Sequence, residues 1–198
     1  MATIKSRVRM IESRVLSDDW YLLKKNTFDF LRNDGTWQRQ NRETYDRGDG
    51  ATILLYSRAK QTVLLTRQFR FPAFANGYDD LLIEAAAGLL DRASPEARIR
   101  AEAEEETGYR VGEVHKVFTA FMSPGSVTEK LHFFVGEYDD AARIGRGGGL
   151  AAEGEDIEVL EMSFTTALAA ISSGKIVDAK TIMLLQHLAL SKILPGSE

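Results

Sequence analysis

The spacing of apolar and polar positions differs between residues 1–48 and the rest of the chain. In residues 1–48 apolar side chains are few and only partly alternate with polar ones, and Asn33-Asp34-Gly35 interrupts them as a hairpin turn. This pattern predicts an antiparallel β-meander that is weak alone and needs the rest of the chain or a second subunit to pack against. We expect its strands within Val8–Leu16, Tyr21–Leu31 and Thr36–Tyr45.

From Gly50 onward the apolar positions form continuous runs, which are typical of buried strands. Strands interspersed with helices predict an α+β fold in which helices cover both faces of a sheet. We therefore expect two domains, an N-terminal antiparallel β-domain over residues 1–48 and a larger domain over residues 49–198. The expected strands of the larger domain are Ala51–Tyr56, Thr62–Thr66, Leu81–Gly88, Val111–Met122, Glu129–Tyr138 and Ile157–Met162, and two of its helices are Phe164–Ser173 and Asp178–Leu194.

A further helix is marked at both of its ends by local signals. Ser94 is a typical N-cap residue, Pro95 suits the first helical position, and Gly108 suits the position that follows a helix. These signals predict a helix over residues 95–107. The glycine-rich segment Arg143–Gly154 has the composition of a mobile loop, for which a plain linker is the commoner interpretation.

Composition and charge narrow the class of protein. The chain has 198 residues, 44% hydrophobic and 27% charged, with a net charge of −4 and no cysteine, which indicates a folded protein without disulfides or thiolate metal sites. Basic and acidic residues are mixed, so we expect no nucleic-acid partner. No segment is long and apolar enough to span a bilayer, and residues 1–14 lack the apolar run of a secretory signal, so we expect a cytoplasmic protein without a membrane partner.

Acidic residues are concentrated in the predicted helix. Since each residue of a helix turns by about 100°, Glu102, Glu105 and Glu106 share an arc of roughly 100°, whereas Glu104 faces the other way. Carboxylates this close repel each other unless a positive charge offsets them. Mg²⁺ takes oxygen ligands together with substrate phosphates, so the arc indicates a magnesium site and a phosphate-containing substrate.

Most acidic runs on helices are solvated faces without a ligand, and the run alone favours that interpretation. The sequence context favours the metal site instead. A Gly88-Leu-Leu-Asp91 loop leaves a buried strand, the helix follows directly, and Glu105-Glu106-Thr107-Gly108 closes it. Ile99 and Ala103 lie beside the acidic arc and would anchor the helix to the sheet.

This combination of loop, helix and spacing resembles the signature of the Nudix hydrolases. Three features depart from that signature: the interval from Gly88 to Glu102 is one residue shorter, Ser94 stands near the place of its first glutamate, and Ala101 replaces its arginine. That arginine orients the glutamates in the family. Arg98 lies one turn before Glu102 on the same face, so we expect it to take over this role, whereas Arg100 points away. The matching residues are Gly88, Glu102, Ala103, Glu105, Glu106, Gly108 and Tyr109.

The resemblance extends over nearly the whole chain and is greatest to the bacterial GDP-mannose hydrolases within that family. It implies hydrolysis of a nucleoside diphosphate sugar to a nucleoside monophosphate and a sugar phosphate, with ADP-ribose pyrophosphatases as the alternative. A non-catalytic nucleotide-sugar-binding module is a third possibility, against which the retained glutamates argue. The segments that carry this resemblance are Val15–Asp18, Arg42–Arg47, Gly50–Tyr56, Arg67–Arg70, Met122–Gly125 and Glu155–Glu161.

The resemblance also implies an α/β/α sandwich, a homodimer that exchanges the N-terminal β-domain, and a set of site residues. Trp20 would stack on the base, although exposed aromatic residues more often serve packing, and Arg42 and Glu43 would reach the nucleotide unless they form a cross-strand ion pair. Arg70 would clamp the diphosphate, and Lys180 would contact the phosphate or sugar; either could instead be a surface charge. The implied metal ligands are Ala87 (through its carbonyl), Glu102, Glu105, Glu106 and Glu155; the implied catalytic residues are Glu105, Glu106, Glu129 and Glu155; the implied substrate contacts are Trp20, Arg42, Glu43, Arg70, Ala87, Gly88, Leu89, Glu106, Glu129, Glu155 and Lys180.

Overall fold

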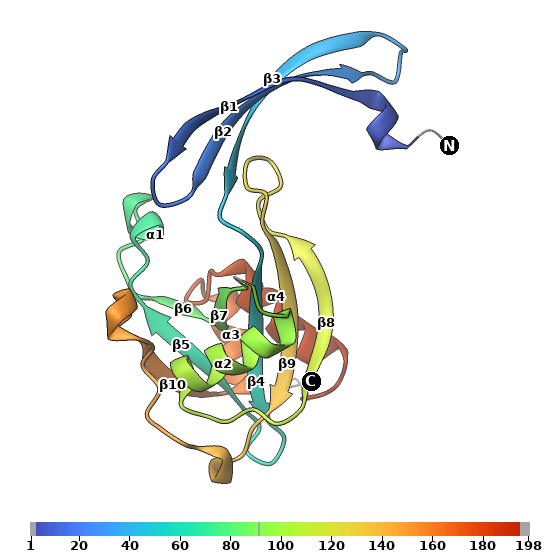
Figure 1. Cartoon of the computed structure of the whole chain (residues 1–198). Helices are drawn as coiled ribbons and strands as arrows, with labels where there is room; N and C mark the ends of the chain where they lie inside the picture. Colours follow the sequence, from blue (N-terminus) through green and yellow to red (C-terminus); the bar gives the residue numbers. More distant parts are fainter. Residues whose placement is uncertain (1–2, 91, 195–198) are drawn as a thin grey trace. The chain divides into compact units, whose positions relative to one another are not determined.

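The structure, a computed structural model, describes residues 3–90 and 92–194. The chain forms two compact units (Figure 1). The first contains the chain up to Gly48 together with Phe121–Lys130, and the second contains Asp49–Ala120 together with the chain from Leu131 onward.

The first unit is a three-stranded antiparallel sheet with the strand order β1-β2-β3. After a short 3₁₀ turn (η1, Ile4–Arg7), its strands are β1 (Val8–Asp18), β2 (Leu22–Leu31) and β3 (Trp37–Asp46), so the three predicted strands and the turn between the second and third are confirmed. No residue from Thr3 to Asp49 is fully buried, as expected for a meander with few apolar side chains. Residues 121–130 join this unit because Tyr45 exchanges backbone hydrogen bonds with Ser126 and Thr128.

The second unit is built on a mixed sheet with the strand order β10-β5-β4-β9-β8. The central strand β4 pairs in parallel with β9 and antiparallel with β5, while β6 pairs with β5 and β7 with β4. The strands are β4 (Gly50–Ser57), β5 (Thr62–Gln68), β6 (Leu82–Glu84), β7 (Ala86–Leu89), β8 (Val114–Phe121), β9 (Lys130–Glu137) and β10 (Glu158–Ser163).

Helices cover both faces of this sheet. Helix α2 (Pro95–Thr107) lies on one face, and α3 (Phe164–Ser172) and α4 (Ala179–Leu190) lie on the other (Figure 1). The predicted α+β fold with three α/β/α layers is confirmed. A five-residue helix after β5, α1 (Phe71–Ala75), was not predicted. None of the helices in the described ranges is long and apolar enough to span a membrane.

Helix α2 begins and ends where the sequence predicts. The Ser94 hydroxyl accepts a hydrogen bond from the amide of Ala97, and Gly108 ends the helix in a left-handed conformation with φ of 76°. Ile99 and Ala103 are completely buried in one apolar cluster with side chains of β4. Because burying a side chain the size of Ile99 is worth about 1.5–3 kcal/mol, these contacts fix the helix and its acidic face against the sheet.

The predicted strand Leu81–Gly88 is interrupted in the structure. β6 pairs with β5 and β7 pairs with β4, so the chain changes partner at Ala85. The amide of Ala85 donates to the Thr181 hydroxyl at 2.6 Å instead of joining a ladder. The single continuous strand was therefore a wrong prediction, because a change of pairing partner depends on residues that are distant in sequence.

The glycine-rich segment is packed against α2 and is not a plain linker. The amides of Gly148 and Gly149 donate to the carbonyls of Glu106 and Glu105, and the amide of Gly145 donates to Gly108. The carbonyls of Glu105 and Glu106 belong to the last turn of α2, where backbone acceptors have no partner within the helix, and Gly108 directly follows that turn. The segment therefore caps α2. Two short 3₁₀ turns accompany it: η2 (Asp140–Ala142) precedes the segment, and η3 (Ala151–Glu153) lies near its end.

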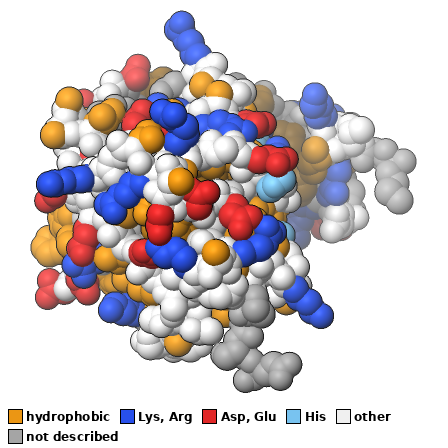
Figure 2. Space-filling view, turned by 90° about the horizontal axis from the view of Figure 1, so that it is seen from below, with side chains coloured by type: hydrophobic (Ala, Val, Ile, Leu, Met, Phe, Trp, Pro, Cys, Tyr) orange, Lys and Arg blue, Asp and Glu red, His pale blue; other side chains and the backbone are white. Residues whose placement is uncertain are grey.

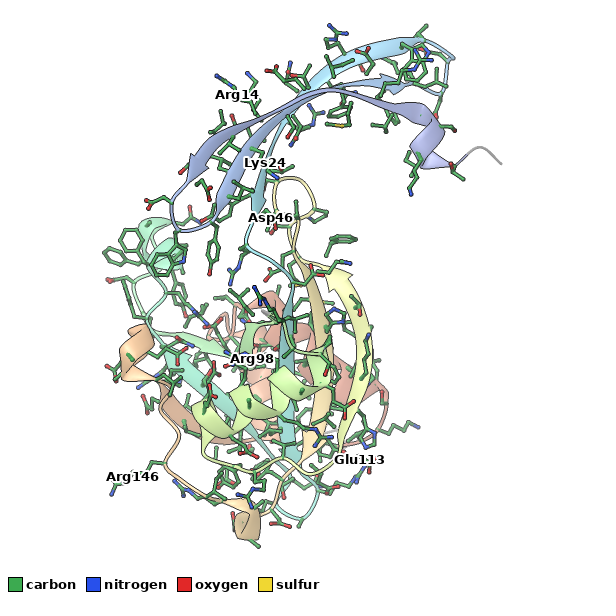
Figure 3. All side chains as sticks on the ribbon, in the orientation of Figure 1. Arg14, Lys24, Asp46, Arg98, Glu113 and Arg146 are labelled. Atoms are coloured by element: carbon green, nitrogen blue, oxygen red, sulfur yellow. The ribbon has the colours of Figure 1, made fainter. Side chains whose placement is uncertain are left out.

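Gly147 shows why glycine is needed in this cap. Its φ is 68°, and a Cβ atom there would lie 2.3 Å from the carbonyl oxygen of Glu106. Its neighbour Arg146, in contrast, extends its side chain into solvent (Figure 3).

The face of the molecule seen in Figure 2 carries basic and acidic side chains interspersed.

Candidate active site

Helix α2 places its glutamates as the helical spacing predicts. Glu102 and Glu106 are 5% and 1% exposed, Glu105 is half-buried, and Glu104 points away toward Arg110, 3.9 Å from its guanidinium. Two ionisable groups that are almost completely buried on one side of a helix are unusual unless they are paired or bind a cation.

The carboxylate of Glu102 lies against Gly88 on β7. A Cβ atom at Gly88 would be 1.7 Å from Oε1 of Glu102, so only glycine leaves room for the glutamate. Arg98 binds the same oxygen at 2.5 Å through Nη2 and donates from Nε to the carbonyl of Leu89. Arg98, which Figure 3 labels, thus joins α2 to β7, whereas Arg100 pairs with Glu96. The predicted contact between Arg98 and the acidic face is confirmed.

Glu106 is the most perturbed carboxyl group of this face. Its Oε2 atom is buried and has no hydrogen-bond partner within residues 3–90 and 92–194. Burial, followed by the negative charges of Glu102 and Glu155, raises the pKa of Glu106 to about 8, and the cation of Arg70 offsets only part of this effect. A buried acceptor without a partner is costly, so the site is suited to a cation.

Glu155 joins these carboxylates from the chain that follows the glycine-rich segment. Its Oε2 accepts a hydrogen bond from the amide of Leu150 at 2.8 Å, and its side chain lies against Gly149, where a Cβ atom would be 2.3 Å from that oxygen. In the described residues no three acidic or histidine side chains already stand together as a metal centre. The carboxylate oxygens of this face are nevertheless the type of ligand that a hard divalent cation prefers, and the buried Oε2 of Glu106 has no other partner among the described residues.

A second group of charges lies beside the acidic face, and its central residue was not predicted. Glu84, the last residue of β6, is 4% exposed and accepts from Nε of Arg70 at 2.7 Å and from Nζ of Lys180 at 2.5 Å. Lys180 also binds Asp178 at 2.9 Å. Burial alone would raise the pKa of Glu84, but the cations of Lys180 and Arg70 lower it below its usual value. Glu84 is thus an ionised buried carboxylate.

Comparison with known proteins finds relatives over nearly the whole chain. A family model described as the GDP-mannose pyrophosphatase NudK N-terminal domain matches residues 7–45. A GDP-mannose pyrophosphatase of Pectobacterium atrosepticum is 58% identical over 93% of this chain and 95% of its own length. Those of Klebsiella pneumoniae and Citrobacter koseri are 52% and 53% identical, each over 96% of this chain and over 96% and 100% of their own lengths.

The chain belongs to the GDP-mannose pyrophosphatase family of Nudix hydrolases. It is therefore an enzyme of that hydrolase class, as the signature residues Gly88, Glu102, Glu105 and Glu106 indicated. The model that matches residues 7–45 lies within the first unit of the structure.

Four predicted residues of this Nudix hydrolase lie in the first unit. Trp20 follows β1 and is 83% exposed, with its ring edge-on to Tyr21. Arg42 and Glu43 are exposed on β3, and as consecutive residues of a strand they point to opposite faces of the sheet. Neither forms an ion pair in the described ranges, so the cross-strand ion pair is not observed. Glu129, 16% exposed, lies 3.6 Å from Arg47.

The remaining predicted residues lie in the second unit. Ala87, Gly88 and Leu89 form most of β7, directly beneath Glu102 and Arg98. Lys180 is only 12% exposed, which rules out a simple surface charge.

The sequence contained one signal for Glu84, which was not predicted as a site residue. Glu84 interrupts the apolar run from Leu81 to Ala87, and a charged residue inside a buried strand requires a partner. Its partners are 14 and 96 residues away, which periodicity does not reveal.

Proposed function

We propose that this enzyme hydrolyses GDP-mannose to GMP and mannose 1-phosphate in a magnesium-dependent reaction. The buried Oε2 of Glu106, without a partner among the described residues and flanked by two further glutamates, is the observation that supports this proposal most strongly. The relatives named GDP-mannose pyrophosphatase, which match nearly the whole chain, support the choice of substrate.

The proposal gives each carboxylate a role. Glu102, Glu106 and Glu155, with the carbonyl of Ala87, would hold Mg²⁺, and Glu105 would assist. Bound there, the cation supplies positive charge that stabilises the negative charge of the diphosphate. Arg98 keeps Glu102 in place through its contact with Oε1.

The reaction needs a water molecule to attack one phosphorus of the diphosphate and one bridging P–O bond to break. Glu155 is the base that we propose for the proton of this water, because its carboxylate is half-buried and is oriented by the amide of Leu150. Glu129, which lies near Arg47 in the first unit, is the competing candidate. E129Q separates the two, because Glu129 is not a proposed metal ligand: a loss of kcat by orders of magnitude in E129Q would assign the base to Glu129, whereas a small loss would leave Glu155.

Substrate contacts are proposed on both units. Arg70 would bind the diphosphate, because a guanidinium group matches phosphate oxygens, and its side chain keeps 42% of its surface exposed. Trp20 would stack on guanine, and Arg42 and Glu43 would contact the nucleotide.

We also propose a cytoplasmic homodimer in which two copies exchange the three-stranded sheet. The absence of any fully buried residue from Thr3 to Asp49 supports this, because a sheet with so little burial gains stability from a second surface. Light scattering coupled to size-exclusion chromatography tests it: a dimer is expected, and a truncation of residues 1–48 should lose it.

One experiment tests the activity. The protein is incubated with Mg²⁺ and a panel of nucleotide sugars, and the products are identified by mass. GMP with mannose phosphate supports the proposal, while AMP with ribose phosphate would establish the ADP-ribose alternative. Tight binding of one compound without any product would establish a non-catalytic binding module. E106Q should lower turnover by orders of magnitude if either enzymatic reaction occurs.

A further inference from the structure

The proposed reaction gives no role to one buried ionised group, Glu84. It ends β6 between Ile83 and Ala85, which are 3% and 1% exposed. Burying an ionised carboxylate is expensive unless cations and hydrogen bonds satisfy it. Each of its oxygens has its own cation: Oε2 accepts from Nε of Arg70 and Oε1 from Nζ of Lys180. Such an arrangement needs a reason beyond stability, because a buried ion pair contributes little net stability.

The two cations differ in exposure. Lys180 is 12% exposed, and its ammonium group binds two carboxylates, Glu84 and Asp178. Asp178 also caps α4 by accepting from the amide of Thr181, and the Thr181 hydroxyl accepts from the amide of Ala85. Lys180 is therefore anchored at the start of α4 against the junction of β6 and β7.

Arg70, in contrast, is 42% exposed and touches Glu84 through Nε, the inner nitrogen of the guanidinium group. The outer nitrogens donate no hydrogen bond among residues 3–90 and 92–194, which leaves them for a ligand. Arg70 itself lies between β5 and the five-residue helix α1, where no side chain caps the helix start. An arginine in such a connection has many rotamers, and the contact with Glu84 selects one of them. Its charge acts on Glu106, so this rotamer lies beside the acidic face of α2.

We propose that Glu84 is a positioning residue that aims the outer guanidinium nitrogens of Arg70 at the diphosphate. This rests on the proposed function, in which Arg70 binds the diphosphate. Lys180 holds Glu84 ionised and in place from the α4 side. A guanidinium fixed in advance loses less freedom on binding and contributes more to the reaction.

A double-mutant cycle with R70A, E84Q and R70A/E84Q tests this, with kcat and KM measured on GDP-mannose. We expect E84Q to lower kcat/KM by about a hundredfold, the cost of a misplaced binding group. The double variant should be no worse than R70A alone, because Glu84 acts only through Arg70. The inference would be overturned if the decrease in kcat/KM of the double variant equalled the product of the two single decreases. It would also be overturned if E84Q kept the wild-type kcat/KM while R70A lost it.

A matched control is available on neighbouring strands. Glu158 binds Arg67 at 2.9 Å in the same kind of carboxylate–guanidinium pair, but on the surface. E158Q should leave kcat/KM unchanged. The Nε–H signal of Arg70 in a ¹⁵N NMR spectrum gives a readout without substrate: slow exchange with water in the wild type and fast exchange in E84Q. Equally slow exchange in E84Q would contradict the positioning role.

A further variant keeps the test decisive if E84Q is unstable. If E84Q does not fold, E84Q/K180M removes the buried acid and its cation together and should show the full loss; wild-type activity in that variant would refute the proposal. If the wild type hydrolyses no nucleotide sugar, the proposed function fails, while the NMR signal still decides whether Glu84 holds Arg70.

Discussion

Replacing Glu106 by glutamine should stabilise the metal-free protein at neutral pH and abolish its activity. In the folded chain burial and the charges of Glu102 and Glu155 raise the pKa of Glu106 to about 8, from 4.5 for an unperturbed glutamate. The unfolded chain releases this proton near pH 4.5, while the folded chain retains it. Stability therefore falls as the pH rises from 4.5 to 8, and it is not affected by this group below pH 4.5.

The size of the effect follows from the two pKa values. Each pH unit in this range costs about 1.4 kcal/mol, so the wild type loses about 3 kcal/mol between pH 4.5 and pH 7. Glutamine has the same shape without the charge, so E106Q should avoid most of this loss. For a chain of this size a change of about 3 kcal/mol shifts the melting temperature by roughly 6–12 °C.

The assay is thermal unfolding followed by circular dichroism in the presence of EDTA, at pH 4.5 and pH 7. E106Q should melt well above the wild type at pH 7 and close to it at pH 4.5, and added Mg²⁺ should stabilise the wild type but not E106Q. E104Q is the matched control, because Glu104 lies on the same helix but points away toward Arg110. The reasoning would be refuted if E106Q did not melt at a higher temperature than the wild type at pH 7, or if the difference in melting temperature were equally large at pH 4.5.

Three further substitutions test the surroundings of the site. G88A places a Cβ atom 1.7 Å from Oε1 of Glu102, so it should lower kcat more than tenfold with little change in the fold, and near-normal kcat would contradict the close contact. G147A should lower the melting temperature by several degrees, because backbone strain of about 1–3 kcal/mol at a positive φ adds to a clash with α2. G145A should not lower it, because a Cβ atom at Gly145 would meet nothing nearer than 4.0 Å. R98A should weaken Mg²⁺ affinity or turnover by about 10–100-fold, and R100A should not; unchanged values in R98A would refute its orienting role.

How far the sequence predicted this structure depends on the range of the interactions involved. Helix α2 was predicted to the residue because Ser94, Pro95 and Gly108 mark its ends locally. The acidic arc followed from helical periodicity, and Arg98 followed from its spacing to Glu102.

Features that depend on distant contacts were not predicted. The break at Ala85 requires Thr181, and the role of Glu84 requires Arg70 and Lys180. That Oε2 of Glu106 has no hydrogen-bond partner in the part of the chain that the structure describes becomes apparent only once the sheet and the helix are packed together. Periodicity places a side chain on a face of its element, but it does not show which other elements lie opposite that face.

The cap on α2 has a consequence for how this family can change its sequence. Because the amides of Gly148 and Gly149 bind the carbonyls of Glu106 and Glu105 at the helix end, Glu155 is carried at a fixed number of residues from Glu106. Substituting the solvent-facing Arg146 keeps the number of residues between the two glutamates. Inserting or deleting a single residue would instead shift which amides face the carbonyls of the helix end. The length of the segment between Glu106 and Glu155 thus sets where Glu155 lies relative to Glu106. We expect selection to preserve the length of this segment more strictly than the identity of its exposed side chains.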